Sequence, residues 1–200
     1  MELLIPGRDH GYLDGDSFDY RGPLAFTLPA VMSPTECAQM IARIEALGPS
    51  DAPVTTASGA VMRPEVRNNQ RVMFDDVALA STLFARIAVP ESLCDMRAVG
   101  INERFRCYRY EPGQRFAPHR DGYFARNDQE RSLLTFMVYL NDDFTGGETA
   151  FLGYACSARP RVGTALLFQH LLDHEGCVVK SGVKYVLRSD VMYRSEVSSG

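Results

Sequence analysis

The stretch SLLTFMVYLNDDFTGGETAFL, residues 132–152, indicates the fold class of this chain. An apolar segment rich in β-branched and aromatic residues is followed by a cluster of Asn, Asp and Gly and then by a second apolar segment. That order is typical of two strands joined by a turn. Similar short segments surround it. They are ERFRCYRYE (103–111), RFAPHRDGY (115–123), GTALLFQH (163–170) and CVVKSGVKYVLRSDVMYR (177–194).

Two helices are expected before this run of strands. The segment 33–50 has apolar residues at helical spacing, and Ser33 opens an S-x-x-E capping box. A second helix is expected at about residues 77–88, with Asp75 or Asp76 as its cap. Helices followed by antiparallel strands predict an α+β protein whose helices pack on one face of a β-sandwich or barrel.

The chain shows no internal repeat or linker, so one domain is expected over residues 1–200. A helical support region at about 30–90 would precede a β-core at about 100–194. The composition, with 46% hydrophobic and 23% charged residues, is that of a globular protein. A formal charge of −4 gives no support for a nucleic-acid partner.

The start of the chain does not resemble a signal peptide, and no apolar run is long enough to cross a bilayer. The five cysteines are odd in number and widely spaced, which argues against a disulfide framework or a structural zinc site. We therefore expect a cytoplasmic protein with reduced thiols and no membrane partner; the sequence says nothing of its oligomeric state.

One H-x-D triplet lies in FAPHRDGYF, residues 116–124. On a strand, His119 and Asp121 would project to one face, as two members of the 2-His-1-carboxylate set that binds Fe(II). The triplet alone is weak evidence, because such a pair arises by chance. A second histidine is needed, and the spacing does not choose between His170 and His174, while His10 lies in a peripheral region.

The last predicted strand carries Lys184 and Arg188 on one face. Two cations that point toward a β-core are costly unless an anion meets them. A 2-oxo acid bound to iron would supply such an anion through its far carboxylate. The other interpretation is an edge strand whose cations face water.

Three stretches together resemble the Fe(II)/2-oxoglutarate-dependent dioxygenases, and within them the prolyl 4-hydroxylase-like group. The resemblance covers about residues 100–194 and rests on H-x-D, Y-L-N-D with G-G-E-T, and H-x-G followed by G-x-K-Y. The stretches are YEPGQRFAPHRDGY (110–123), SLLTFMVYLNDDFTGGETAFL (132–152) and PRVGTALLFQHLLDHEGCVVKSGVKYVLRSDVMY (160–193).

The resemblance implies a double-stranded β-helix (jelly-roll, cupin-like) core, with the N-terminal helices packed on one sheet. It implies Fe(II), the cosubstrate 2-oxoglutarate and O2 as cofactors, with ascorbate as a candidate reductant. The implied reaction is hydroxylation of an unactivated C–H bond, with release of succinate and CO2. The implied iron ligands are His119, Asp121 and His174; the implied cosubstrate residues are Lys184, Tyr110, Tyr139, Thr135 and Arg188.

Lys184 is preferred over Arg188 as the partner of the C5 carboxylate, and Arg188 is also a candidate substrate contact. The other candidate substrate residues are Arg67, Asn69 and Tyr123. Residues 67–71 and 125–131 are candidate lids, the second as a flexible surface loop.

The resemblance favours a prolyl residue of a peptide or protein as substrate. A small molecule or free amino acid remains an alternative, as do a dioxygenase that does not use 2-oxoglutarate and a non-catalytic metal-dependent sensor on the same fold.

Overall fold

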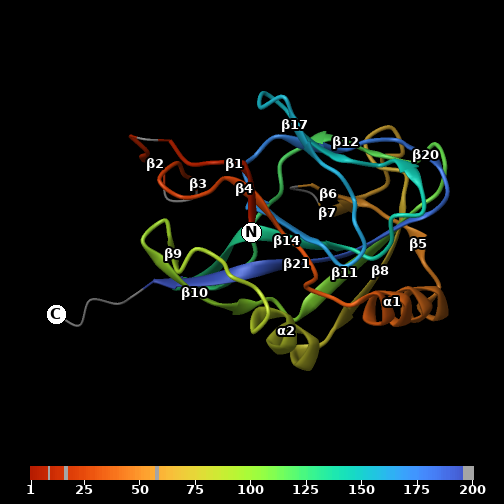
Figure 1. Ribbon diagram of the computed structural model, residues 1–200, viewed down its shortest axis with the longest axis horizontal. Helices are drawn as coiled ribbons and strands as arrows, with labels where there is room; N and C mark the ends of the chain where they lie inside the picture. The colour runs from red at the N-terminus through yellow and green to blue at the C-terminus, as the bar shows by residue number, and fades with distance from the viewer. Residues whose placement is uncertain (9, 16–17, 57–58, 196–200) are drawn as a thin grey trace.

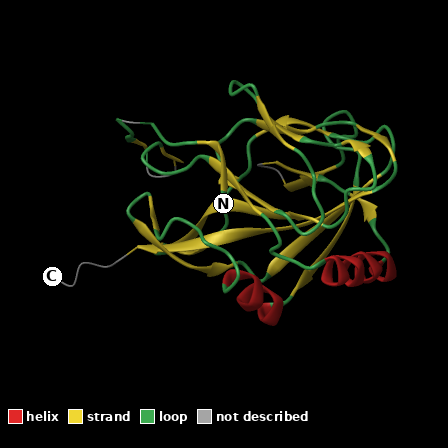
Figure 2. Cartoon of the chain, viewed as in Figure 1, coloured by secondary structure: helices red, strands yellow, loops and turns green. Residues whose placement is uncertain are grey.

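The computed structural model describes residues 1–8, 10–15, 18–56 and 59–195. Its core is a large sheet that faces a smaller one, with both described helices on the outer side of the large sheet (Figures 1 and 2). This is the jelly-roll arrangement expected from the sequence. Within the described residues, neither helix has the length and apolar character that a membrane crossing requires.

The large sheet supplies most of the cavity wall described below. Its main path runs, in order, through β1 (Glu2–Ile5), β4 (Ala25–Leu28), β18 (Ala165–Gln169), β14 (Glu130–Tyr139), β21 (Lys184–Ser195), β11 (Arg104–Tyr110), β8 (Gln70–Asp75) and β5 (Ser50–Asp51). Its side branches are β9 (Ser92–Leu93), β10 (Met96–Ile101) and β13 (Ala125–Asn127).

The smaller sheet carries two of the candidate ligands. Its strands, in order, are β12 (Phe116–His119), β19 (His174–Gly176), β16 (Thr149–Phe151) and β17 (Cys156–Ala158). Three further pairs complete the described strands: β2 (Leu13–Asp14) with β3 (Phe18–Asp19), β6 (Val54–Thr56) with β7 (Gly59–Val61), and β15 (Thr145–Gly146) with β20 (Val179–Ser181).

The first helix, α1 (Pro34–Leu47), forms as its sequence predicts. Ser33 accepts from the Glu36 amide while the Glu36 carboxylate accepts from the Ser33 amide, which completes the capping box. The buried face of α1 includes Met40 and Ile44, which belong to the apolar cluster beneath the large sheet.

The second helix, α2 (Val77–Phe84), begins at the predicted cap, Asp76, whose carboxylate accepts from the Leu79 amide. It ends four residues before the expected position. The Arg86 amide already bonds back to the carbonyl of Leu83, a tightened last turn that closes the helix.

Alternation along β11 divides the molecule into two apolar layers. Phe105 and Cys107 point to the helices and join the cluster that contains α1. Tyr108 and Tyr110 point to the opposite face and join the cluster between the two sheets. Successive side chains of a strand face opposite sides, so Arg106 shares the inner face with these tyrosines.

Residues 125–131 do not form the flexible loop that was expected. They make a hairpin of β13 and the start of β14. The Asn127 side chain accepts from the amides of Gln129 and Glu130, which closes the turn, and Arg126 pairs with Glu130 and Glu103. The expectation of a flexible loop was therefore wrong, because these bonds order the segment.

Candidate active site

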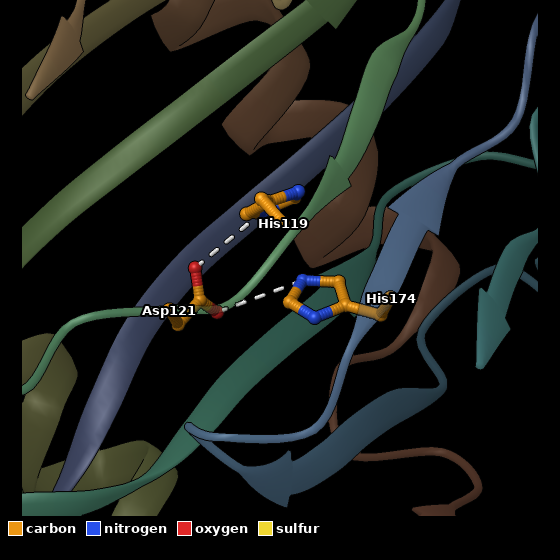
Figure 3. A group of neighbouring side chains, drawn as sticks. All are labelled: His119, Asp121 and His174. Carbon is orange, nitrogen blue, oxygen red and sulfur yellow. Dashed lines mark ion pairs between the residues drawn. The ribbon is translucent and has the colours of Figure 1, made fainter. Parts of the chain in front are cut away.

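Two histidines face each other in the smaller sheet. β12 and β19 are antiparallel, and His119 lies opposite His174 in their register, with ring centroids 4.2 Å apart. Asp121 brings its carboxylate to both rings, so one potential ligand atom from each of the three residues lies within 4.8 Å of the others (Figure 3). The structure thus brings together the three predicted iron ligands, and selects His174 over His170 and His10.

Asp121 lies beyond the strand that alternation predicts for it. β12 ends at His119, and the amide of Asp121 donates to the carbonyl of His170 at 2.9 Å. The carboxylate reaches the site through this tertiary contact. The expectation of one strand carrying both ligands was therefore wrong for Asp121, although its side chain arrives where the motif requires.

Hydrogen bonds orient both imidazoles for metal binding. The Nδ1 atoms of His119 and His174 lie 2.8 and 2.9 Å from the carbonyls of Ala117 and Leu172, so each Nδ1 carries the proton and donates. Each Nε2 then keeps its lone pair and lies 3.7 or 3.8 Å from an oxygen of Asp121 (Figure 3). Burial, together with the neighbouring His174, lowers the pKa of His119 to about 4, so this ring is neutral at pH 7.

The carboxylate of Asp121 is held at one oxygen. Oδ2 accepts from Thr135 Oγ1 at 2.6 Å and lies 3.0 Å from Arg188 Nη2. Burial alone would raise the pKa of Asp121, but the Arg188 guanidinium holds it well below its ordinary value. Asp121 is therefore ionised, with Oδ1 turned toward His119.

His170 supports this arrangement without joining the ligand set. Its Nε2 lies 2.8 Å from Ser132 Oγ, and its Nδ1 lies 2.9 Å from Thr135 Oγ1, the hydroxyl that donates to Asp121. Since that hydroxyl gives its proton to the carboxylate, Nδ1 of His170 is the donor to Thr135. His170 therefore fixes the rotamer of Thr135.

Lys184 is a buried cation that lines the same cavity as the three candidate ligands. Its Nζ donates to the carbonyl of Gly147 at 2.6 Å and lies 5.1 and 5.5 Å from the ring centroids of Tyr110 and Tyr139. No described carboxylate lies within ion-pair distance of it. Burial lowers the pKa of Lys184 to about 8, which an anion would reverse.

The donor set and the buried amine fit the implied cofactors. Two imidazoles and one carboxylate on one side of a site are the ligands of non-haem Fe(II) centres that keep open positions. Lys184 then offers a positive charge to the far carboxylate of a bound 2-oxo dicarboxylic acid.

The ligands and Lys184 line one cavity of about 330 Å³. Its walls combine the inner face of the large sheet with the smaller sheet. Of the residues predicted from the sequence, those that line it are His119, Asp121, His174, Lys184, Tyr110, Thr135, Arg188, Arg67 and Tyr123.

Two predicted residues lie behind the wall. Tyr139 is fully buried, and its hydroxyl is 2.8 Å from that of Thr149, which does line the cavity. Asn69 is fully buried and accepts from Arg67 Nε at 2.7 Å. Asn69 therefore orients a cavity residue and does not itself face the cavity.

Arg71, Arg106 and Thr149 also line the cavity, and they were not among the predicted site residues. For Arg106 a signal existed, because it alternates with the inward-facing Tyr108 and Tyr110 on one strand. For Thr149 no local signal exists, since its exposure to the cavity depends on how the smaller sheet folds over the large one.

Comparison with known proteins places this geometry in a family. Residues 105–189 match the family model of the 2OG-Fe(II) oxygenase superfamily. Prolyl 4-hydroxylase 1 of Arabidopsis thaliana is 27% identical over 191 residues, an alignment that covers 82% of this chain and 66% of the relative. The chain thus spans just under two thirds of that relative's length.

Solved structures share the fold. A prolyl-4-hydroxylase of Pseudomonas putida superposes with a TM-score of 0.60 at 17% identity, covering 86% of this chain and 93% of the other. A prolyl hydroxylase from Trichoplax adhaerens, solved with a peptide fragment of the hypoxia inducible factor oxygen degradation domain, gives 0.65 at 16% identity, covering 84% and 82%.

Residues 105–189 thus match the domain of the 2OG-Fe(II) oxygenases, and the described fold and the cluster of His119, Asp121 and His174 agree with that match. Among curated proteins the chain is similar to a prolyl 4-hydroxylase, and it shares the fold of solved prolyl hydroxylases. The predicted family, the double-stranded β-helix core and the cofactor class of Fe(II), 2-oxoglutarate and O2 are confirmed.

Proposed function

We propose that this protein hydroxylates a prolyl residue of a peptide or protein, consuming 2-oxoglutarate and O2 and releasing succinate and CO2. The observation that carries the proposal is the three-ligand cluster of His119, Asp121 and His174 in one cavity with the buried amine of Lys184. The prolyl 4-hydroxylase relative and the peptide in the Trichoplax structure support the substrate class.

In this proposal His119 and His174 bind Fe(II) through Nε2 and Asp121 binds it through a carboxylate oxygen. When bound, Fe(II) with 2-oxoglutarate supplies the oxidative decarboxylation that drives C–H hydroxylation. Lys184 binds the C5 carboxylate, and Tyr110 packs beside that amine. The protein residues hold and orient the reactants, and none of them is required as a general acid or base.

Arg188 and Lys184 differ in their partners. Its guanidinium lies 3.0 Å from Asp121 and 3.4 Å from Asp190, so both its nearest carboxylates belong to the protein. Lys184 has only a neutral carbonyl as acceptor. We therefore assign the cosubstrate carboxylate to Lys184 and the orientation of Asp121 to Arg188.

Apolar side chains enclose the reacting groups. Met137, Phe168 and Val186 line the same cavity as the candidate metal ligands and Lys184. An apolar wall limits the water that reaches a reactive centre and strengthens the ion pairs inside it. The exposed Tyr123, at 61% relative exposure, lies where a peptide would enter.

We also propose that the chain acts as one domain in the cytoplasm. Helix α1 shares its apolar cluster with the β-core, which supports a single folding unit. Burial raises the pKa of Cys37 and Cys107 to about 11 and about 12, as suits thiols kept reduced. Cell fractionation with a tagged chain tests the location.

The test of function uses protein purified anaerobically and supplied with Fe(II), 2-oxoglutarate and O2. Prolyl peptides are expected to stimulate succinate release and to gain the mass of one oxygen atom. His174→Ala provides the background. Succinate release no higher than this background, across a broad peptide set, would refute the proposal.

A further inference from the structure

The cavity wall carries more positive charge than the cosubstrate requires. Asp121 is the single carboxylate among the described lining residues. The cationic side chains that line the same cavity are Arg67, Arg71, Arg106, Arg120, Lys184 and Arg188.

Three of these arginines are matched by carboxylates of the protein. Arg106 lies 3.1 Å from Asp190, and Arg120 lies 2.8 Å from Asp173. Arg188 is held by Asp121, as described above. With Lys184 assigned to 2-oxoglutarate, two cations are left over.

Arg67 and Arg71 are those two. Among residues 1–8, 10–15, 18–56 and 59–195, no carboxylate forms an ion pair with either. A charge in a partly desolvated wall is costly without an anion, so their joint presence calls for a ligand.

The side chain of Arg67 is held in a fixed position from which it can donate hydrogen bonds. It is only 5% exposed, and its guanidinium lies between the rings of Tyr108 and Phe116, 4.3 and 4.4 Å from their centroids. Asn69 holds its Nε, while its Nη2 is buried and has no partner. A stacked, hydrogen-bonded guanidinium with one unpaired nitrogen is suited to donate to a carboxylate.

Arg71 extends the same positive region. It lies opposite Tyr108 in the β8–β11 register and lines the cavity. Burial, with the charges of Arg67 and Arg106, lowers its pKa. An anion placed between Arg67 and Arg71 would relieve this repulsion.

The position differs from that of the cosubstrate. Lys184 lies opposite Tyr110 in the β11–β21 register, whereas Arg67 stacks on Tyr108. Two residues along a strand correspond to about 7 Å, so a ligand at Arg67 and Arg71 would lie beside 2-oxoglutarate.

We propose that Arg67 and Arg71 bind a carboxylate of the substrate, which makes this protein selective for prolyl peptides with a carboxylate next to the target proline. This inference rests on the proposed function and narrows it. The carboxylate has two sources, the C-terminus of a peptide that ends in proline or an acidic side chain beside an internal proline.

The test compares three probes: acetyl-Gly-Pro-amide, acetyl-Gly-Pro with a free carboxylate, and acetyl-Gly-Pro-Glu-amide. Calorimetry under anaerobic conditions, with Fe(II) and 2-oxoglutarate bound, measures each dissociation constant. One or both carboxylate probes should bind about 10- to 100-fold more tightly than the neutral one, as expected for a charge-assisted hydrogen bond. The carboxylate probe that binds more tightly than the neutral one identifies the source of the carboxylate.

Variants assign the preference to the two arginines. Arg71→Gln should abolish it, and Arg67→Lys should reduce it because the stacked fork is lost. Arg97→Gln removes the same charge from β10, outside the cavity lining, and should keep it. Thermal unfolding checks that each variant folds. Equal affinity for all three probes, or a preference that survives Arg71→Gln, would overturn the proposal.

The same protein also separates the two proposals. If the neutral probe binds as tightly as the others and gains oxygen, the carboxylate site is refuted and the hydroxylase stands. If the carboxylate probes bind selectively but no prolyl peptide gains oxygen, the carboxylate site is supported and the proposed function fails.

Discussion

Arg188 Nη2 lies 3.0 Å from Asp121 Oδ2, the oxygen that also accepts from Thr135. Two donors on one oxygen fix the carboxylate plane and leave Oδ1 for the metal. We predict that Arg188→Met weakens Fe(II) binding about 10- to 100-fold, because outer hydrogen bonds to a ligand commonly have effects of that size. Arg188→Lys, which keeps the charge, should weaken Fe(II) binding less than Arg188→Met.

Anaerobic Fe(II) titration measures these affinities, and circular dichroism monitors folding. If Arg188→Met instead left the metal affinity intact and raised the 2-oxoglutarate dissociation constant, Arg188 and not Lys184 would be the cosubstrate partner.

Lys184→Ala should weaken 2-oxoglutarate binding and leave Fe(II) binding intact, the opposite of the effect expected for Arg188→Met. Loss of a buried charge-assisted bond to the C5 carboxylate predicts a 2-oxoglutarate dissociation constant raised about 100-fold, with metal content nearly unchanged. Lys180→Ala removes an exposed lysine four residues earlier and should affect neither quantity. A wild-type response to 2-oxoglutarate in Lys184→Ala would contradict the assignment.

The pKa of Lys184 predicts a pH dependence of cosubstrate binding. Burial lowers that pKa from 10.5 to about 8 in the free protein, and a bound dicarboxylate raises it again. Binding therefore takes up a proton above pH 8, and affinity for 2-oxoglutarate should fall as pH rises from 8 to 10. Lys184→Arg should flatten the profile, because a guanidinium stays charged; an equally steep profile in that variant would argue against Lys184.

The lowered pKa of Lys184 also makes the stability of the ligand-free protein depend on pH. Between about pH 8 and 10.5 the unfolded chain holds the Lys184 proton while the folded, ligand-free protein releases it. Lys184 alone therefore makes the free energy of unfolding increase with pH in this window. Denaturant titrations of the wild type and Lys184→Met, compared at both ends of the window, measure the difference.

An alanine in place of Gly147 should strain the backbone and disturb the cosubstrate site. Its φ is +70°, and an added Cβ would lie 3.2 Å from Lys184 Cδ and 3.0 Å from Phe144 Cε2. Gly153 has φ +81° with no atom within 4 Å, so Gly153→Ala imposes comparable backbone strain without the contacts. Both alanine variants should lose about 1 kcal/mol of stability from the left-handed backbone alone.

Only Gly147→Ala should also weaken 2-oxoglutarate binding, as measured by calorimetry beside thermal unfolding. Equal cosubstrate affinity in the two variants would show that Lys184 tolerates the displacement.

The features predicted correctly from sequence are those with local causes. The capping box at Ser33 and the cap at Asp76 need only neighbouring residues. Alternation placed Lys184 and Arg188 on one inward face because a strand has a fixed period of two.

The features that were missed depend on contacts between distant segments. Asp121 is held by the His170 carbonyl from outside its own strand, and the 125–131 hairpin is stabilised partly by Glu103. Arg71 faces the cavity because of its pairing with β11, which no local pattern encodes.

The pairing of His119 with His174 across β12 and β19 has a consequence for the register of these two strands. A slip of one residue in this short ladder would turn one imidazole away from the other. A metal ion bound by both rings would therefore favour the correct register of the β12–β19 ladder, which has only the pairs Phe116–Gly176 and His119–His174. Amide hydrogen exchange in β12 and β19 should slow on addition of Fe(II), while exchange in β14 and β21 at the centre of the large sheet changes little.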